Sequence, residues 1–302
     1  MVKTKRTLKI QSKKGRKNLS KKICAPHRQE ESMTCFSKDN LLKLIFAIDK
    51  QKTENKIFPN TTKRVIKKMS RPELWKALRS NLKGNCSNER CWKDTYLSKD
   101  KQLEAELKPV YPAEWHENST EWLTTSNIEN IVNQFELKYK TFVFIGAVPI
   151  DFDDKYNGKC IVNELCNISI KNLFKAKKHL FGCIFNLDEH YKPGSHWVAM
   201  FADFKKGHIV YFDSYGYKPN DEISILLKRL KLQNEKRGVP TKIIINTIRH
   251  QYENSECGMY CIYFITKMLE GKMDYILNNR IPDKRMVNHR TRYFYKKKLS
   301  GL

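Results

Sequence analysis

The chain lacks any apolar run that approaches the roughly 18 residues of a membrane-spanning helix. Its longest apolar runs lie at 141–149 and 261–265, and their lengths suit a strand or a core helix. The N-terminus is charged but has no apolar core segment, so we expect neither a secretory signal nor a membrane partner. No internal repeat is visible. The sequence therefore favours a globular protein over a membrane or repeat protein.

Acidic residues are missing from both ends of the chain. Residues 1–22 hold ten Lys and Arg, residues 284–302 hold seven, and neither segment has an Asp or Glu. Together they carry 17 of the 26 positive charges in excess, which leaves about +9 on the body. Such charge attracts polyanions, DNA or RNA above all, although a solvated tail or a nuclear import signal explains it equally well. The residues that we expect to contact nucleic acid are Lys13, Lys14, Arg16, Lys17, Lys296, Lys297 and Lys298.

The cysteines show no regular framework. There are nine of them, an odd number with irregular spacing, so we expect free thiols and a reducing, intracellular compartment. Cys24 with His27, and Cys86 with Cys91, are spaced like parts of a zinc site, but neither pair completes a set of four ligands. We therefore predict no metal and no cofactor.

The chain has room for one large domain and a smaller module, since it has 302 residues of which 40 % are hydrophobic. An aromatic content of 11 % excludes global disorder. We predict four parts, namely a basic disordered tail at 1–22, a helical N-terminal module at 23–108, an α+β domain at 109–283 and a basic C-terminal tail at 284–302.

The N-terminal module is predicted to consist of helices. Ser37 is suited to cap the first helix, and a second covers 63–69. Pro72 and Gly84 mark the start and the end of a third. The module has too few apolar residues for a deep core, so we expect it to pack on the rest of the chain.

In the larger domain, helices and strands are mixed. Apolar periodicity predicts helices at 125–137, 223–232 and 258–269, the first of them capped by Thr125 or Ser126. Runs of β-branched and aromatic residues predict strands at 141–145, 180–187, 195–204, 208–213 and 242–248.

Cys257 lies between the polar loop 251–256 and the apolar helix that follows. At the first turn of a helix, free amides and the helix dipole favour the thiolate, which is the reactive form of cysteine. Gly258 removes side-chain bulk, so we expect a substrate backbone to approach there. Free cysteine is more commonly an inert core residue, as we expect of Cys261 one turn later.

His196 and Asp213 lie on two predicted strands that form a hairpin. Trp197 beside His196 provides rigidity and partial desolvation, which suit a general base. Asp213 ends the second strand, where its carboxylate can orient the imidazole. Asp203 is a competing acid, but seven residues along one strand span about 23 Å, which is too far for contact.

Gln251 lies six residues before Cys257 and is suited to donate a hydrogen bond to an oxyanion. Each of these residues alone is more simply explained as an ordinary core, turn or loop residue. The ordered set of His196, Asp213, Gln251 and Cys257 followed by glycine is far more specific than any one member.

This order resembles that of the SUMO-protease-like and adenovirus-protease-like cysteine peptidases over about residues 115–270. Glu256 departs from the pattern, since many members have Asp before the cysteine. The resemblance implies an α+β fold with a central mixed sheet flanked by helices and a papain-like active site in permuted chain order. It implies a cysteine endopeptidase with catalytic residues His196, Asp213, Gln251 and Cys257 and substrate contacts by Trp122, Trp197 and Gly258. The matching stretches are His196–Trp197, Phe212–Ser214, Gln251, Cys257–Gly258, and Trp122–Leu123 with Ile128, which is similar to the family's Trp-Leu-x-x-x-x-Ile entry helix.

The N-terminal module adds a narrower resemblance, to the region that precedes the catalytic domain in polyprotein-processing proteases of large DNA viruses of the African swine fever virus type. It implies a thiol endopeptidase that cuts structural precursors during virion maturation, after small residues such as Gly-Gly. The implied location is the virion and the host cytoplasm, with the nucleus as the alternative. The stretches that carry this resemblance are Cys24–Pro26, Thr34–Lys38, Leu74–Leu78 and Cys91–Trp92.

Three alternatives remain open at this point. One is a protease that removes SUMO- or ubiquitin-like modifiers. Another is a nucleic-acid-binding virion scaffold with an inactive protease fold, against which the presence of all four catalytic residue types counts. A third is acyl transfer, for which the sequence offers no acyl-CoA phosphate loop.

Overall fold

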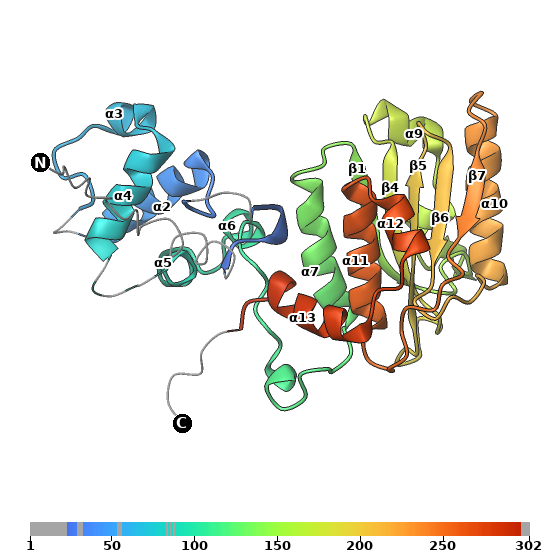
Figure 1. Ribbon diagram of the computed structural model, residues 1–302. Coiled ribbons are helices and arrows are strands. Elements are labelled where there is room, and N and C mark those ends of the chain that lie inside the picture. The colour runs from blue at the N-terminus through green and yellow to red at the C-terminus, as the bar shows by residue number, and fades with distance from the viewer. Residues whose placement is uncertain are drawn as a thin grey trace, which may run out of the picture. The chain divides into compact units, whose positions relative to one another are not determined.

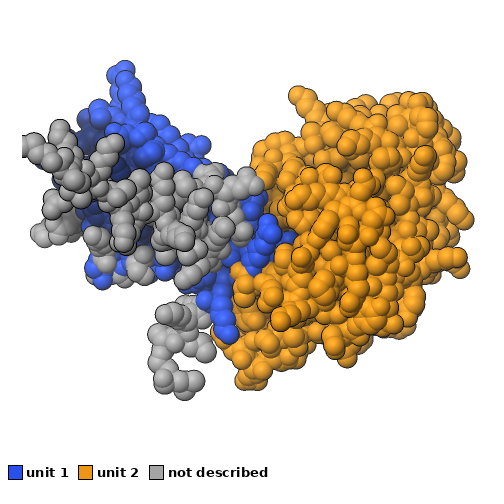
Figure 2. Space-filling view, viewed as in Figure 1, with its two compact units in different colours: residues 1–110, 292–297 blue, residues 111–291, 298–302 orange. Residues whose placement is uncertain are grey.

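The computed structural model describes residues 23–28, 33–52, 56–82, 84, 86 and 88–296. The chain forms two compact units, which Figures 1 and 2 show. Unit 1 comprises residues 1–110 with 292–297, and unit 2 comprises 111–291 with 298–302. Among the described residues, no helix is long and apolar enough to cross a membrane.

Unit 1 is helical. The predicted cap at Ser37 is confirmed, because its side chain accepts a hydrogen bond from the amide of Asn40. Two short helices were not predicted; they begin after the capping side chains of Asn88 and Asp100, which accept bonds from first-turn amides. The helices are η1 (Pro26–Arg28), α2 (Lys38–Gln51), α3 (Lys63–Lys68), α4 (Arg71–Leu82), α5 (Glu89–Tyr96) and α6 (Lys101–Ala105).

Unit 1 also has a hydrophobic core of its own, so the expectation of a module without a deep core is wrong. Helices α2 and α4 each contribute the apolar residues of one face to this core, and Trp92 of α5 packs with them. The indole of Trp92 donates a hydrogen bond to the carbonyl of Cys86. Apolar residues three and four apart suffice here because several short helices converge on one point. The fully buried members on α2 and α4 are Leu41, Leu44, Ile45, Ile48, Leu74 and Leu78.

The prediction that the cysteines form no disulfide framework is wrong. Six cysteines form disulfides, Cys24–Cys35, Cys86–Cys91 and Cys160–Cys166, with Cα atoms 5.0, 5.6 and 6.3 Å apart. Turns within 5 to 11 residues bring each pair within bonding distance, which irregular spacing does not reveal. The argument for a reducing compartment therefore loses its basis.

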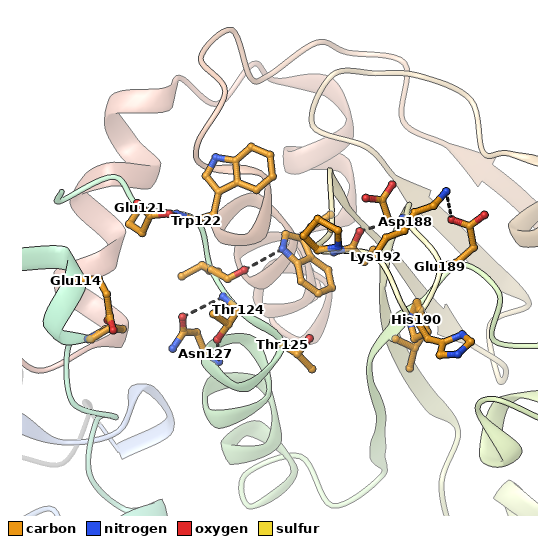
Figure 3. A pocket seen from close by; sticks show the side chains of 18 of the residues that line it. Glu114, Glu121, Trp122, Thr124, Thr125, Asn127, Asp188, Glu189, His190 and Lys192 are labelled. Carbon is orange, nitrogen blue, oxygen red and sulfur yellow. Dashed lines mark hydrogen bonds and ion pairs between the residues drawn. The ribbon is translucent and has the colours of Figure 1, made fainter.

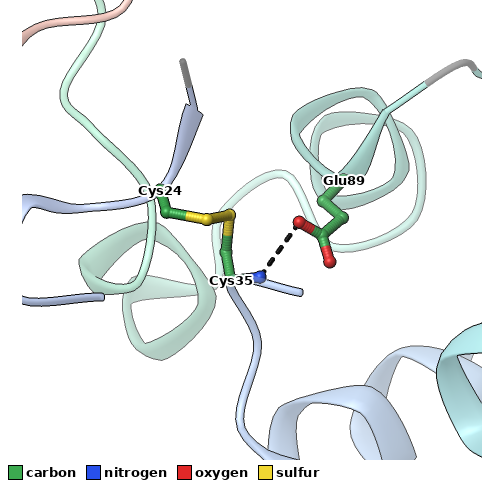
Figure 4. Close-up of side chains that lie close together, drawn as sticks. All are labelled: Cys24, Cys35 and Glu89. Atoms are coloured by element: carbon green, nitrogen blue, oxygen red, sulfur yellow. Dashed lines mark hydrogen bonds between the residues drawn. A yellow bond between two sulfur atoms is a disulfide. The ribbon is translucent and has the colours of Figure 1, made fainter. Parts of the chain in front are cut away.

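One cluster has the composition of a metal site. Cys24, Cys35 and Glu89 place their ligand atoms within 4.8 Å of one another (Figure 4). The two sulfur atoms are joined to each other, however, and a disulfide offers no thiolate to a metal. Glu89 instead accepts hydrogen bonds from the amide of Cys35 at 3.1 Å and from the hydroxyl of Thr34. The cluster ties the start of unit 1 to α5.

Unit 2 is built on a five-stranded mixed sheet, in the order β1-β4-β5-β6-β7. The two outer pairs are parallel and the two inner pairs are antiparallel. The predicted α+β class with a central mixed sheet is confirmed. The strands are β1 (Phe142–Pro149), β4 (Leu180–Asn186), β5 (Trp197–Asp203), β6 (His208–Phe212) and β7 (Lys242–Ile245), with β2 (Lys155–Tyr156) and β3 (Lys159–Cys160) as a separate hairpin.

Helices cover both faces of this sheet (Figure 1). On one face lie α7 (Thr125–Glu136), α11 (Cys257–Leu269) and α12 (Met273–Asn278). The other face carries α8 (Asn163–Cys166), α9 (Ile170–Lys175) and α10 (Asp221–Glu235), whose apolar residues share one core with the strands. Helix α11 is buried along nearly its whole length, as its apolar sequence predicts.

Two boundaries differ from the predictions in ways that affect the site. The cap of α7 is Thr124, not Thr125 or Ser126, and it forms a reciprocal capping box with Asn127. Strand β5 starts at Trp197, so His196 precedes the strand rather than lying within it.

The C-terminal segment begins as a helix, so the prediction of a tail from residue 284 is wrong as far as Tyr293. Helix α13 spans Asp283–Tyr293, and it buries Met286 and Arg290 completely or nearly so. The basic composition of residues 284–302 did not indicate this helix, because it does not show that the charge of Arg290 is neutralised inside unit 2. Lys296 is exposed. Lys13, Lys14, Arg16, Lys17, Lys297 and Lys298 lie outside the described residues.

Candidate active site

The sheet brings His196 and Asp213 together at one edge. Because β5 and β6 are antiparallel, the residue before β5 and the residue after β6 are neighbours. His196 Nε2 lies 2.9 Å from Asp213 Oδ1, and this carboxylate is almost fully buried. The same oxygen accepts from the amide of Tyr215 at 2.8 Å. Two donors thus fix the orientation of the acid against the imidazole.

Cys257 is the first residue of α11, and its side chain is 2 % exposed. The first-turn amides of a helix have no partners within it, and the helix dipole adds positive potential there. The thiol of Cys257 is close enough to the imidazole of His196 to raise its pKa, and Nε2 of that imidazole faces Asp213. Histidine therefore lies between the thiol and the carboxylate, as the sequence order predicts.

The electrostatics of His196 favour its protonated form. Burial lowers the pKa of His196, but hydrogen bonds to Asp213 and Cys257 and their negative charges outweigh it and raise the pKa to about 9. An imidazole with this pKa stays charged at neutral pH, where it can stabilise a thiolate. The arrangement is suited to a thiolate–imidazolium pair.

This pKa predicts a pH-dependent stability. The folded-state pKa is raised above the unfolded value of 6.5, so His196 stabilises the fold fully below pH 6.5 and loses that contribution as the pH rises towards 9. The loss is expected to be about 3 kcal/mol. Urea unfolding of the wild type and of His196→Gln between pH 6 and pH 9.5 measures it. The difference in unfolding free energy should shrink across this interval, and a constant difference would contradict the raised pKa.

Gln251 is fully buried beside this group, and its amide is oriented by neighbours. The hydroxyl of Ser214 donates to Gln251 Oε1 at 2.7 Å, which turns Nε2 the other way. Nε2 donates to the carbonyl of Glu253 at 2.6 Å and reaches the hydroxyl of Tyr215 at 3.3 Å. One amide hydrogen of Gln251 thus points towards the hydroxyl of Tyr215. An oxyanion could take the place of this hydroxyl as the acceptor of the hydrogen bond.

Two contributors were not predicted. Ser214 orients Gln251, and the ring of Tyr215 lies over the imidazole of His196 with centroids 4.9 Å apart. Both residues follow Asp213 directly in the sequence, so their position after the predicted acid was the one feature that could have indicated a role in the site. Nothing in the sequence tells that Ser214 and Gln251 are partners, since the pair is formed by the return of the chain from β7.

Trp197 and Gly258 serve the local packing of the site. Trp197 is 5 % exposed, and its indole donates to the carbonyl of Leu123 at 3.0 Å. A Cβ atom on Gly258 would lie 3.0 Å from the Cβ and Cδ1 atoms of Leu123. The glycine therefore makes room for Leu123, and the substrate contact expected at Gly258 stays a prediction. Together these contacts place the segment 121–124 against the start of α11.

A groove of about 960 Å³ opens beside Trp197, and Trp122 lines it (Figure 3). Trp122 is 39 % exposed, so part of its ring is open to a ligand in this groove. Glu121 and Trp122 lie on one side of the groove, and Asp188, Glu189 and Lys192 lie on the other. Trp197, the sequence neighbour of His196, lines this groove, whereas His196, Asp213, Gln251 and Cys257 are not among its lining residues.

Comparison with known proteins agrees with this geometry. Residues 115–301 match the Ulp1 protease family, C-terminal catalytic domain. The chain is 32 % identical to the "Putative thiol protease R355" of Acanthamoeba polyphaga mimivirus, over 90 % of this chain and 93 % of that protein. It is 28 % identical to a cysteine protease of African swine fever virus, over 76 % of this chain and 90 % of that protein.

A solved structure extends the likeness to three dimensions. The crystal structure of the African swine fever virus protease superposes with a TM-score of 0.57 at 25 % identity, covering 75 % of this chain and 89 % of that one. Sequence, fold and the Cys–His–Asp geometry thus agree. The chain belongs to the Ulp1 protease family and is a cysteine protease.

Proposed function

We propose that this protein is a thiol endopeptidase that processes viral structural polyprotein precursors during virion maturation, at Gly-Gly-X sites. The observation that carries the proposal is the similarity to a mimivirus thiol protease over 90 % of the chain, which includes unit 1 and not only the catalytic domain. We further propose that it acts in the virion and the host cytoplasm, on protein substrates.

The proposed reaction uses His196, Asp213, Gln251 and Cys257. The Cys257 thiol gives its proton to His196, and the thiolate attacks the peptide carbonyl carbon. The amide of Gln251 and the backbone N–H of Cys257 stabilise the resulting oxyanion. His196 then protonates the leaving amine, and a thioester remains on Cys257. Water, deprotonated by His196, hydrolyses this thioester and restores the thiol.

The preference for small residues rests on the groove. Trp122 and Trp197 contribute two large aromatic side chains to its lining, and Leu123 fills the space above Gly258. A glycine pair, which has no Cβ atoms, meets the least steric hindrance beside these rings. The aromatic faces provide apolar contact without requiring a side chain on the substrate.

Replacing Trp122 with alanine is expected to lower kcat/KM for a Gly-Gly-X peptide about tenfold, because an apolar contact with the substrate is lost. Alkylation of Cys257 by iodoacetamide should keep its wild-type rate, since the proposed role of Trp122 is to contact the substrate and not the nucleophile. The matched control is Tyr156→Ala, which removes another exposed aromatic side chain, on β2. Equal kcat/KM for Trp122→Ala and the wild type would remove Trp122 from the substrate site.

A second candidate is the removal of SUMO-like modifiers. It is favoured by the name of another relative, a protein of African swine fever virus called a "SUMO-1 cysteine protease", which is 29 % identical over 76 % of this chain. Incubation with a viral structural precursor and with a SUMO-linked protein, in parallel, separates the two. Cleavage of the precursor alone supports our proposal, and cleavage of the conjugate alone overturns it in favour of the alternative. A protein inactive on both, with unreactive Cys257, would fit the scaffold hypothesis.

A further inference from the structure

A buried ion pair lies directly beside the nucleophile. Glu256, the residue before Cys257, and Arg290 of α13 are each 1 % exposed. Arg290 Nε lies 3.1 Å from both carboxylate oxygens of Glu256, and Nη2 lies 2.9 Å from Oε1. Both residues belong to unit 2. The pair therefore joins the C-terminal helix to the residue that caps the nucleophile helix.

Arg290 also contacts the groove. Its guanidinium lies over the ring of Trp115, 4.3 Å from the centroid, and Trp115 lines the groove of Figure 3. The indole of Trp115 is in turn packed edge-on against Tyr111. One buried side chain thus touches both the turn that holds Cys257 and a wall of the substrate groove.

The charge balance around Glu256 depends on Arg290. Burial raises the pKa of Glu256, and the hydrogen bonds and charge of Arg290 act against that rise. The other ionisable groups that face Glu256 are Asp283 at the start of α13, Tyr260 on α11 and Tyr111. Asp283 adds negative charge, and Arg290 is the cation in contact with the carboxylate.

We propose that Arg290 is a positioning residue for the cysteine protease reaction, which holds Glu256 as a neutralised anion and thereby fixes the charge and the geometry at the first turn of α11. An unpaired carboxylate next to Cys257 would oppose the thiolate, and an unpaired guanidinium would favour it while leaving a buried charge. The proposal rests on Cys257 being the nucleophile. It makes α13 part of the active-site architecture.

The test is the pH dependence of Cys257 alkylation by iodoacetamide, mapped by mass spectrometry on the folded full-length protein. In Glu256→Gln the charge of Arg290 has lost its partner, so the midpoint pH of Cys257 alkylation should fall by about one unit. In Arg290→Met the carboxylate of Glu256 has lost its partner, so this midpoint should rise by about one unit. The double variant has neither charge and should return close to the wild-type midpoint. Arg290→Lys keeps the charge and should also stay close to it.

A structural role alone would give different results. If the ion pair only stabilised the fold, each single variant would unfold more easily, but its folded molecules would keep the wild-type pH midpoint of Cys257 alkylation. That outcome would overturn the proposal. Shifts of the same sign in both single variants would overturn it as well. Arg229→Met is the matched control, because Arg229 pairs bidentately with Asp153 on the α10 side of the sheet. Wild-type protein that is not alkylated at Cys257 would overturn the nucleophile assignment together with this proposal.

Discussion

Cys257→Ala is expected to abolish peptide cleavage, with a loss in kcat of about 10⁴-fold or more, because the thioester forms on the Cys257 sulfur. The fold should survive. Cys257 is buried at the start of α11, where alanine fits the space and is a good helix former. The thermal midpoint of the variant should therefore lie within a few degrees of the wild-type value.

The control for this variant is Cys261→Ala. Cys261 lies one turn further along α11 and is fully buried, and burial raises the pKa of its thiol well above the usual value. Such a thiol stays protonated and inert, so its removal should cost some packing energy but little activity. The measurement is cleavage of a Gly-Gly-X peptide by both variants at equal folded concentration. Residual cleavage by Cys257→Ala would mean that the nucleophile lies elsewhere.

The sequence was sufficient for the elements whose pattern is local. Ser37, the β-branched and aromatic runs of β5 and β6 and the apolar run of α11 each contain their own signal, because caps, strands and buried helices depend on residues within a few positions. The candidate catalytic residues were found for a related reason. His196, Asp213 and Cys257 each lie where a strand or helix starts or ends, whereas Gln251 lies in the loop between β7 and α11.

What the sequence could not predict depends on long-range contacts. Arg290 appeared to belong to a basic tail, because its partner Glu256 is 34 residues away. Cys24 and Cys35 appeared free, because only the fold of unit 1 brings their sulfur atoms together. Nothing in the sequence indicated that Gly258 also makes room for Leu123, which comes from a distant segment. In each case the residue type was compatible with two environments, and the tertiary structure selected one.

The roles of the acid and the base are expected to separate in a comparison of His196→Ala with Asp213→Asn. The first removes the proton acceptor and should lower kcat/KM about 10³- to 10⁴-fold. The second should lower it only about 10- to 100-fold. An asparagine can still present its carbonyl oxygen to His196, because the amide of Tyr215 donates to the same position and selects the oxygen over the nitrogen.

The cost of Asp213→Asn should come from lost charge rather than lost orientation. Without the carboxylate, the negative charge that helps to raise the pKa of His196 to about 9 is gone, so the pKa should fall towards its usual range. The activity of this variant should therefore decline at a lower pH than that of the wild type. Profiles of kcat/KM from pH 6 to pH 10 measure both effects. An equal and total loss of activity in both variants would contradict this expectation. It would show that the Cys257–His196 pair needs the negative charge of Asp213, and that alignment of the imidazole by an oxygen at this position is not sufficient.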